Sequence, residues 1–221
     1  MKQITREAVR SFLPQRPANG HKGTFGRVLV VAGSRTMCGA GFLCAKSALL
    51  AGAGLVYWAL PQSMQPAFAA ALPEVITWPM PQTPQGEMAE EGFGFLQKQI
   101  EQVRPSVLVI GPGMGKSPLL EPLLWKTQLP LVIDADALNA LSKCRGWSSQ
   151  WPQKRCCIFT PHPGEMARLL GEETVTDEPS RLGQVQTLCA QTRGVCLLKG
   201  AGTLVAVSQE GGCEVWQNTT G

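Results

Sequence analysis

Five short clusters of glycine and polar residues contain the groups of this chain that could do chemistry. They are GSR (33–35), GPGMG (111–115), DAD (134–136), TPHPGE (160–165) and KGAGT (199–203). Each cluster directly follows a run rich in Val, Ile and Leu. If those runs are parallel strands of an open sheet, the clusters emerge at the same carboxyl edge, where ligands bind. The order of the sequence therefore predicts one ligand-binding crevice formed by these loops.

The segment GPGMGKS (111–117) has the glycine content of a phosphate-binding P-loop but lacks its first glycine. The P-loop pattern requires a glycine five positions before Gly115, and this chain has Ile110 there. The glycines still allow the backbone to approach a phosphate or a planar ring, with N–H groups pointing at it. The alternative interpretation is a purely structural tight turn.

The DAD cluster (134–136) offers two carboxylates at the end of a buried strand. Asp134 stands where a carboxylate can hold a substrate hydroxyl or a hydrated Mg²⁺. Asp136 either shares that role or caps a helix that begins at Ala137. Asp134 is therefore the stronger functional candidate.

His162 lies between Pro161 and Pro163 in a stiff turn, with Glu165 in the first turn of the next helix. Such rigidity suits a binding residue, and the alternative is a buried histidine with satisfied hydrogen bonds. No second ligand stands at metal-binding spacing, which argues against zinc.

Two further segments place a lysine beside glycines. KGAGT (199–203) either lies along the phosphates of a nucleotide or is a plain hairpin connection between strands. HKGTFG (21–26) precedes the first expected strand, and Lys22 or Lys46 either faces anionic substrate groups or is only solvated.

The elements that must position these clusters alternate between strand and helix. Strands are predicted at 27–31, 55–60, 107–110, 131–133, 157–159 and 195–198, helices at 40–51, 88–101, 119–126, 164–170 and 179–191, a hairpin at 203–207 and 213–216, and a surface crossover at 78–85. The alternation predicts one α/β domain with three αβα layers and a mostly parallel, doubly wound sheet. A barrel fits less well because the C-terminal part is irregular.

Composition and charge restrict the class of protein. With 44% hydrophobic and 16% charged residues, the 221-residue chain is typical of a soluble globular protein, not a disordered or fibrous one. A net charge of +4 without a basic run indicates neither nucleic acid nor a membrane surface as partner. The N-terminus lacks the apolar stretch of a signal peptide, which favours the cytoplasm.

Two apolar features need a separate interpretation. The segment 39–60 is long enough to cross a bilayer, but Gly52, Gly54 and Pro61 instead predict a helix followed by a buried strand. None of the eight cysteines forms a CxxC pair. Cysteines 44, 156, 157 and 196 lie in apolar runs, so they are predicted to be reduced and buried.

Taken in order, HKGTFG, VVAGS, CGAGF, AGAGLVYWALP, VIGPGMG, IDADALN, FTPHPGEMARLLG and LLKGAGTLVA resemble the ADP- or ATP-dependent NAD(P)H-hydrate dehydratases. The resemblance extends from about Leu13 to the last residue. It implies a ribokinase-like fold and the repair of hydrated NADH or NADPH, with ADP or ATP as co-substrate and Mg²⁺. It also implies a homo-oligomer, namely a tetramer.

The resemblance also implies roles for individual residues. Ala40, Gly113, Gly115 and His162 would contact the hydrated dinucleotide, Asp134 and Glu165 would line the same crevice, and Lys199, Gly200, Ala201, Gly202 and Thr203 would run along the nucleotide. The family's general base is an aspartate in a G-[ST]-G-D turn, and Asn218 to Gly221 match the segment before that turn. The expected catalytic aspartate thus lies beyond Gly221. We therefore expect weak ligand binding, negligible turnover and a domain incomplete at its C-terminus.

Two other functions are compatible with the same pattern. A ribokinase-like vitamin kinase would share the fold and the glycine-aspartate turn. A non-catalytic remnant would keep the dinucleotide crevice without turnover. TPHPGE together with IDADALN and HKGTFG favours the dehydratases.

Overall fold

The computed structural model describes residues 1–220, which form two compact units. The central unit is Asn19–Ala140. The terminal unit combines Met1–Ala18 with the chain from Leu141 onward, and it therefore contains both ends of the chain.

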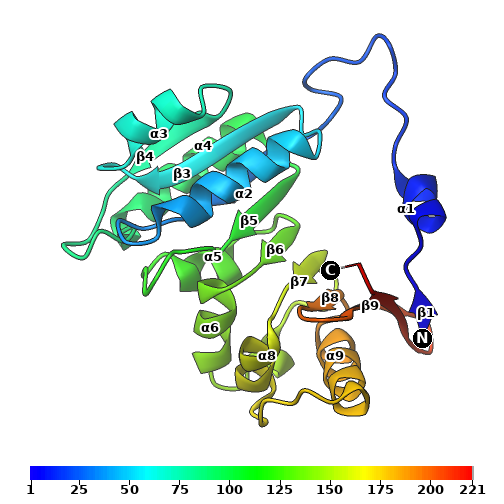
Figure 1. The fold of residues 1–221 in the computed structure, drawn as a ribbon. Helices are drawn as coiled ribbons and strands as arrows, with labels where there is room; N and C mark the ends of the chain where they lie inside the picture. The colour runs from blue at the N-terminus through cyan, green and yellow to red at the C-terminus, as the bar shows by residue number, and fades with distance from the viewer. Residues whose placement is uncertain (221) are drawn as a thin grey trace. The chain divides into compact units, whose positions relative to one another are not determined.

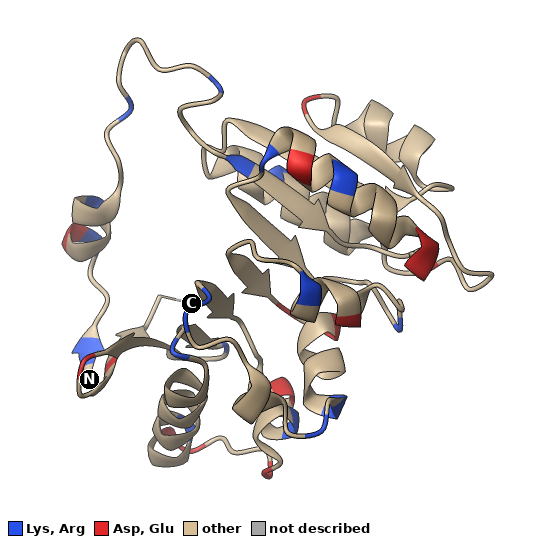
Figure 2. Cartoon of the chain, turned by 180° about the vertical axis from the view of Figure 1, so that it is seen from behind, with Lys and Arg blue, Asp and Glu red and all other residues tan. Residues whose placement is uncertain are grey.

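The central unit is built on a sheet of parallel strands. These are β2 (Arg27–Val31), β3 (Leu55–Pro61), β4 (Ile76–Met80), β5 (Val107–Ile110) and β6 (Leu131–Ile133), in the order β4-β3-β2-β5-β6. The strand order reverses between β2 and β5, which makes their carboxyl ends a topological switch point. Strands β3 to β6 contain no charged residue, as Figure 2 shows, because both faces of a parallel sheet are buried.

Helices cover both faces of this sheet. They are α2 (Cys38–Leu50), α3 (Gln65–Ala71), the 3₁₀ turn η1 (Glu90–Gly92), α4 (Phe93–Val103), α5 (Leu120–Lys126) and α6 (Asp136–Lys143), which begins in this unit. In Figure 1, α2 lies in front of the strands and α4 behind them. Helices can pack on both faces because a strand points alternate side chains to opposite faces of the sheet. Successive residues of β3 show this.

Trp58 and Tyr57 of β3 anchor the two faces. The fully buried Trp58 ring lies 5.2 Å from the Phe68 ring of α3, and its Nε1 donates to the Ala32 carbonyl at 3.0 Å. Helix α2 packs on the same ring through Gly41, where a Cβ would lie only 2.6 Å from Trp58. Tyr57 contacts Trp78 of β4 on the other face at 5.0 Å.

The terminal unit contains a mixed sheet. Its strands are β7 (Cys157–Phe159), β8 (Val195–Leu198), β9 (Thr203–Gln209), β10 (Gly212–Asn218) and β1 (Lys2–Gln3). Strand β7 is parallel to β8, β9 is antiparallel to both β8 and β10, and β1 is parallel to β10. The helices are α1 (Arg6–Phe12), α7 (Trp147–Gln150), α8 (Pro163–Leu170) and α9 (Glu178–Thr192). Helix α9 contacts β8, β9 and β10.

The α/β fold class and most elements agree with the sequence predictions. Strands at 27–31, 107–110, 131–133, 157–159 and 195–198 have the predicted bounds. The predicted crossover 78–85 is partly wrong, because Trp78 to Met80 complete β4. Pro79 concealed this strand, and a proline is tolerated there because β4 is an edge strand. The predicted helix 88–101 is also partly wrong, since α4 starts only at Phe93, after η1.

Two predictions about apolar segments have different outcomes. Segment 39–60 forms α2, a turn and β3, and no helix within residues 1–220 has the length and apolarity needed to span a bilayer.

All eight cysteines are free, and Cys157 and Cys196 are buried. Cys156 is exposed, which corrects the prediction, and Cys44 is only partly buried. Cys156 faces solvent because neighbouring residues of an extended chain point to opposite sides.

Candidate functional site

The loops after β2 and β5 meet at the switch point of the central unit. The Gly33 N–H donates to the Pro112 carbonyl at 2.8 Å. Gly113 has a φ of +64°, and a Cβ there would lie 2.8 Å from the Met37 oxygen and 2.9 Å from the Ala40 Cβ. Only glycine therefore fits at position 113 without a shift. Two predicted dinucleotide contacts, Ala40 and Gly113, are thus direct neighbours.

The DAD turn after β6 adjoins the same loop. A Cβ on Gly111 would lie 1.8 Å from the Asp134 carbonyl oxygen, so β5 and β6 end in close contact. Burial, and then the negative charge of Asp134, raise the pKa of the Cys44 thiol of α2 to about 11. The Asp134 carboxylate is therefore close enough to α2 to affect its Cys44 thiol.

Ala135 lies between the two aspartates in a strained conformation. Its φ is +50°, in the left-handed region that alanine rarely adopts. Strained backbone of this kind is concentrated at ligand-binding and active sites. Nothing in the local sequence indicated the strain, because alanine at this position predicts ordinary helix or strand geometry.

Asp136 binds the glycine-rich loop directly. Its Oδ2 accepts the Gly115 N–H at 2.8 Å, and Asp136 is the first residue of α6. The interpretation of Asp136 as a cap before a helix starting at Ala137 is therefore wrong. The Gly115 N–H is also not free for a phosphate, because a carboxylate already accepts it. This loop is thus held in shape by a charge-assisted hydrogen bond.

Glu87 is a site residue that the sequence did not reveal. Its Oε1 accepts the Lys116 N–H at 2.7 Å, and a Cβ on Gly115 would lie 2.4 Å from the same oxygen. The adjoining Gly86 carbonyl accepts the Arg35 N–H at 2.9 Å. Segment 86–88 therefore connects the loops after β2 and β5. Its only signal in the sequence was a glycine and an acid, Gly86 and Glu87, directly after the segment 78–85 that was interpreted as a surface crossover.

His162 and Glu165 form a reciprocal cap on α8 in the terminal unit. The His162 Nδ1 accepts the N–H groups of Gly164 and Glu165 at 3.0 and 3.4 Å, while Glu165 Oε2 accepts the His162 N–H at 2.8 Å. Because Nδ1 is an acceptor, these bonds place the proton of a neutral imidazole on Nε2. The His162 side chain is 49% exposed. It is therefore hydrogen-bonded but not buried, and its Nε2 lies 3.4 Å from Glu165 Oε1.

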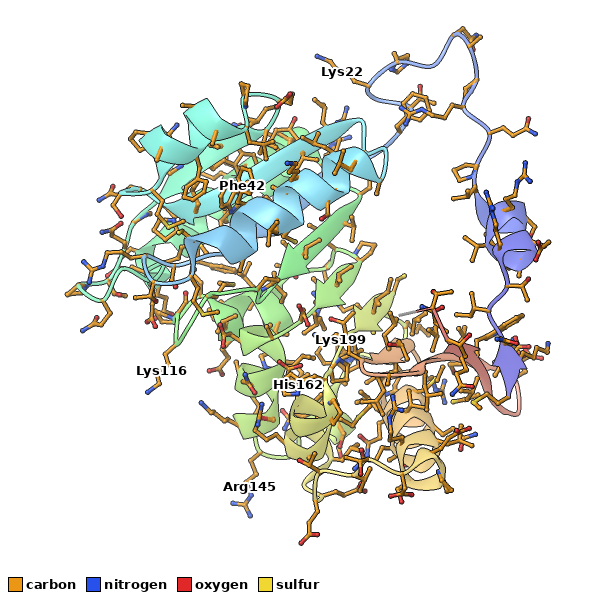
Figure 3. The ribbon with its side chains drawn as sticks, viewed as in Figure 1. Lys22, Phe42, Lys116, Arg145, His162 and Lys199 are labelled. Carbon is orange, nitrogen blue, oxygen red and sulfur yellow. The ribbon has the colours of Figure 1, made fainter. Side chains whose placement is uncertain are left out.

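Lys199 connects the second predicted loop to this cap. The Lys199 N–H donates to the Pro161 carbonyl at 2.9 Å, and its Nζ lies 3.9 Å from Glu165 Oε2. Figure 3 shows Lys199 and His162 at neighbouring loops of the terminal unit. Residues 199–202 connect the antiparallel strands β8 and β9, so the hairpin interpretation is confirmed. A hairpin loop can still bind a nucleotide.

The other two lysines that the sequence singled out, Lys22 and Lys46, lie in the central unit. A Cβ on Gly54, just before β3, would lie 1.7 Å from the Lys22 carbonyl, which places Lys22 at the amino end of the sheet. The Lys46 Nζ lies 5.7 Å from the centre of the Phe42 ring on α2, where Lys46 is exposed.

The predicted site residues thus form two groups, each within one unit. Ala40, Gly113, Gly115 and Asp134 belong to the central unit, and His162, Glu165, Lys199, Gly200, Ala201, Gly202 and Thr203 belong to the terminal unit. No cluster of three or more His, Cys, Asp or Glu residues able to hold a metal occurs within residues 1–220. The Asp134 carboxylate after β6 is a group of the kind that holds a phosphate-bound Mg²⁺.

Comparison with known proteins identifies the family of the chain. A family model described as NAD(P)H-hydrate dehydratase matches residues 28–221. A bifunctional NAD(P)H-hydrate repair enzyme of Moorella thermoacetica is 41% identical over 208 residues, which cover 92% of this chain and 38% of that enzyme. This chain therefore spans less than half the length of the curated relative.

Solved structures show the same similarity. An ADP/ATP-dependent NAD(P)H-hydrate dehydratase from Bacillus subtilis, co-crystallized with ATP and Mg²⁺, aligns with a TM-score of 0.77 and 29% identity, over all of this chain and 73% of that one. A ribokinase-like protein of Enterococcus faecalis aligns with a TM-score of 0.79 and 25% identity, over 100% of this chain and 72% of its own. The chain belongs to the NAD(P)H-hydrate dehydratase family.

Proposed function

We propose that this chain acts in the ADP- or ATP-dependent dehydration of hydrated NADH or NADPH. The observation that carries the proposal is the contact of Gly113 with Ala40 at the switch point, on the loop whose Gly111 adjoins Asp134, inside the segment that matches the dehydratase family. Ligands of open α/β sheets bind at such points. The B. subtilis relative with ATP and Mg²⁺ supports the choice of nucleotide.

The central unit provides a rigid wall for the hydrated dinucleotide. Gly113 lacks a side chain, so a planar ring or sugar can approach the backbone beside Ala40. The Asp134 carboxylate is an acceptor for a ligand hydroxyl. Asp136 and Glu87 hold the loop by accepting the Gly115 and Lys116 N–H groups, so it needs little rearrangement on binding.

The terminal unit provides charge for the nucleotide. Removal of water from the hydrated ring is made easier when a phosphoryl group is transferred to the ring hydroxyl, because phosphate then leaves in place of hydroxide. The ammonium of Lys199 would stabilise negative charge on the phosphates, while the buried Glu165 fixes its position. Mg²⁺, when bound, would neutralise phosphate charge. The resemblance assigns the general base to an aspartate outside these residues, so their proposed role is binding and charge stabilisation.

Calorimetric binding and hydrate consumption test this proposal together. The 221-residue chain is titrated with Mg²⁺-ATP, Mg²⁺-ADP and hydrated NADH, and loss of the hydrate is followed by absorbance. Binding of both ligand classes supports the proposal, and absence of both overturns it. Binding without turnover favours the non-catalytic alternative, and phosphorylation of hydroxymethylpyrimidine or hydroxyethylthiazole favours the vitamin kinase.

The two histidines provide a matched pair of variants. In both, Nδ1 accepts a nearby N–H, from Gly164 for His162 and from Gly23 for His21. Asparagine retains an acceptor at each position. We expect His162→Asn to weaken binding of hydrated NADH about tenfold, or 1.4 kcal/mol, and His21→Asn to leave it unchanged. Equal effects would contradict a ligand contact at His162.

We also propose that the protein is a cytoplasmic homotetramer, as the family resemblance implies. Sedimentation equilibrium measures the oligomeric state directly. A mass near 23.7 kDa, that of one chain, would contradict the tetramer.

A further inference from the structure

A buried arginine lies beneath the loop that joins β8 and β9. Arg181, in the first turns of α9, is only 8% exposed. Its Nη1 donates to the Ala201 carbonyl at 2.9 Å and its Nη2 to the Gly202 carbonyl at 3.3 Å. One guanidinium therefore holds two consecutive carbonyls of the predicted nucleotide loop.

The charge of Arg181 is not neutralised within residues 1–220. Both of its hydrogen bonds go to neutral carbonyls, its Nε has no partner, and no ion pair includes it. A buried charge without an opposite charge is costly. An anion bound on the loop above it would reduce that cost.

The same contacts determine which way the loop amides face. In a trans peptide the carbonyl of one residue and the N–H of the next point in opposite directions, and no peptide bond within residues 1–220 is cis. Because the Ala201 carbonyl points toward Arg181, the Gly202 N–H points away from it. Within the same described range, the N–H groups of Gly200, Ala201 and Gly202 have no backbone acceptor.

Glycine makes this conformation possible. Gly200 has a φ of +138° and Gly202 a φ of +61°. A Cβ on Gly202 would also lie 2.9 Å from Gln217 Nε2. Successive N–H groups that face outward from such a turn form a concave site for anions.

We propose that Arg181 is a positioning residue that turns the Gly202 amide outward and adds positive potential for a polyphosphate bound at this loop, where the Gly200 and Ala201 N–H groups also have no backbone acceptor within residues 1–220. The ligand class is a nucleoside di- or triphosphate. The choice of this ligand class rests on the proposed function, whereas the contacts between Arg181 and the loop do not depend on it. Arg181 acts through the loop and is not itself a catalytic residue.

Three variants test this inference. Arg181→Met removes the charge and both hydrogen bonds, and Arg181→Lys keeps the charge in case the first variant folds poorly. Arg145→Met is the matched control, because Arg145 is exposed in the same unit and Figure 3 shows it directed away from the labelled loops. Binding of ATP, ADP and adenosine is measured by calorimetry, and backbone order of residues 200–203 by ¹⁵N relaxation.

We expect Arg181→Met to weaken ATP and ADP binding tenfold or more, about 1.4 kcal/mol, with little effect on adenosine. Arg181→Lys should recover part of this loss, and Arg145→Met should match the unchanged protein. Order parameters of Ala201 and Gly202 should fall in Arg181→Met even without nucleotide. Unchanged order and unchanged ATP affinity would overturn the inference. Failure of the unchanged protein to bind any nucleotide would overturn the proposed function, and the order parameters would still decide the role of Arg181.

Discussion

Two carboxylates from separate segments hold consecutive amides of the GPGMGKS segment (111–117). Asp136 accepts the Gly115 N–H and Glu87 accepts the Lys116 N–H, at 2.8 and 2.7 Å. Both bonds are charge-assisted and thus stronger than bonds between neutral groups. These two bonds therefore hold the loop in one conformation.

Replacement of Glu87 should therefore destabilise the loop. We expect Glu87→Ala to lower the free energy of unfolding by about 1–2 kcal/mol, because the Lys116 N–H loses its acceptor. Glu87→Gln retains an acceptor oxygen and should lose less. Urea denaturation measures both, with the exposed Glu74→Ala as control. A loss for Glu87→Ala no larger than for Glu74→Ala would show that the bond contributes nothing.

Gly113 and Gly94 allow a direct test of backbone strain. At Gly113 a side chain meets Met37 and Ala40 at a positive φ, whereas a Cβ on Gly94 in α4 meets nothing within 4 Å. Gly113→Ala should cost about 1–3 kcal/mol and weaken binding of hydrated NADH. Gly94→Ala should stabilise the protein by about 0.5–1 kcal/mol through higher helix propensity. Thermal and urea unfolding measure the two, and a change of the same sign for both variants would contradict a special backbone requirement at Gly113.

At the scale of elements, helices α8 and α9 of the terminal unit begin with side-chain caps. The Asp177 Oδ2 accepts the Ser180 N–H at 3.0 Å at the start of α9, and His162 and Glu165 cap α8. Helix α9 carries Arg181 and packs on β8, β9 and β10. The cap of α9 therefore helps to define the position of the loop that Arg181 holds.

The cap of α9 should make stability depend on pH. Hydrogen bonds from Ser180 hold the pKa of the Asp177 carboxyl below its usual value. A depressed pKa stabilises the folded state above the unfolded pKa, near 4, and this contribution is lost as the pH falls through the folded pKa. Asp177→Asn keeps a capping oxygen that does not titrate, so its urea midpoint should decline less from about pH 5 to about pH 2. Parallel declines for the two proteins would exclude this role for Asp177.

The sequence predicted elements well where apolar runs had clear boundaries. Strand β5 ends at Ile110 before Gly111, and β7 ends at Phe159 before Pro161, so glycine and proline identified both ends. Strand β4 was missed because Pro79 interrupts its pattern, and with it the position of Glu87. The left-handed Ala135 and the hydrogen bonds of Arg181 depend on tertiary contacts, which local patterns do not encode.

For the molecule as a whole, the sequence predicted one domain with one crevice. The α/β class is confirmed, and the predicted site residues gather into two groups, each within a compact unit. That both groups of residues line one crevice stays a prediction. It rested on the rule that parallel strands share a carboxyl edge, and that rule applies directly to β2, β5 and β6 of the central unit.

Ligand binding should raise the stability of the whole chain if the proposed function is correct. A ligand at about 100 times its Kd stabilises the folded state by about 2.7 kcal/mol, provided that it does not bind the unfolded chain. For a chain of this size, each kcal/mol raises the Tm by about 2–4 °C, so Mg²⁺-ATP should raise it by roughly 5–10 °C. Adenosine lacks the phosphates that the 200–202 amides and Lys199 would bind, so its effect should be much smaller. Differential scanning calorimetry over a series of ATP concentrations measures this, and a Tm that does not rise with ATP would contradict nucleotide binding by the folded chain.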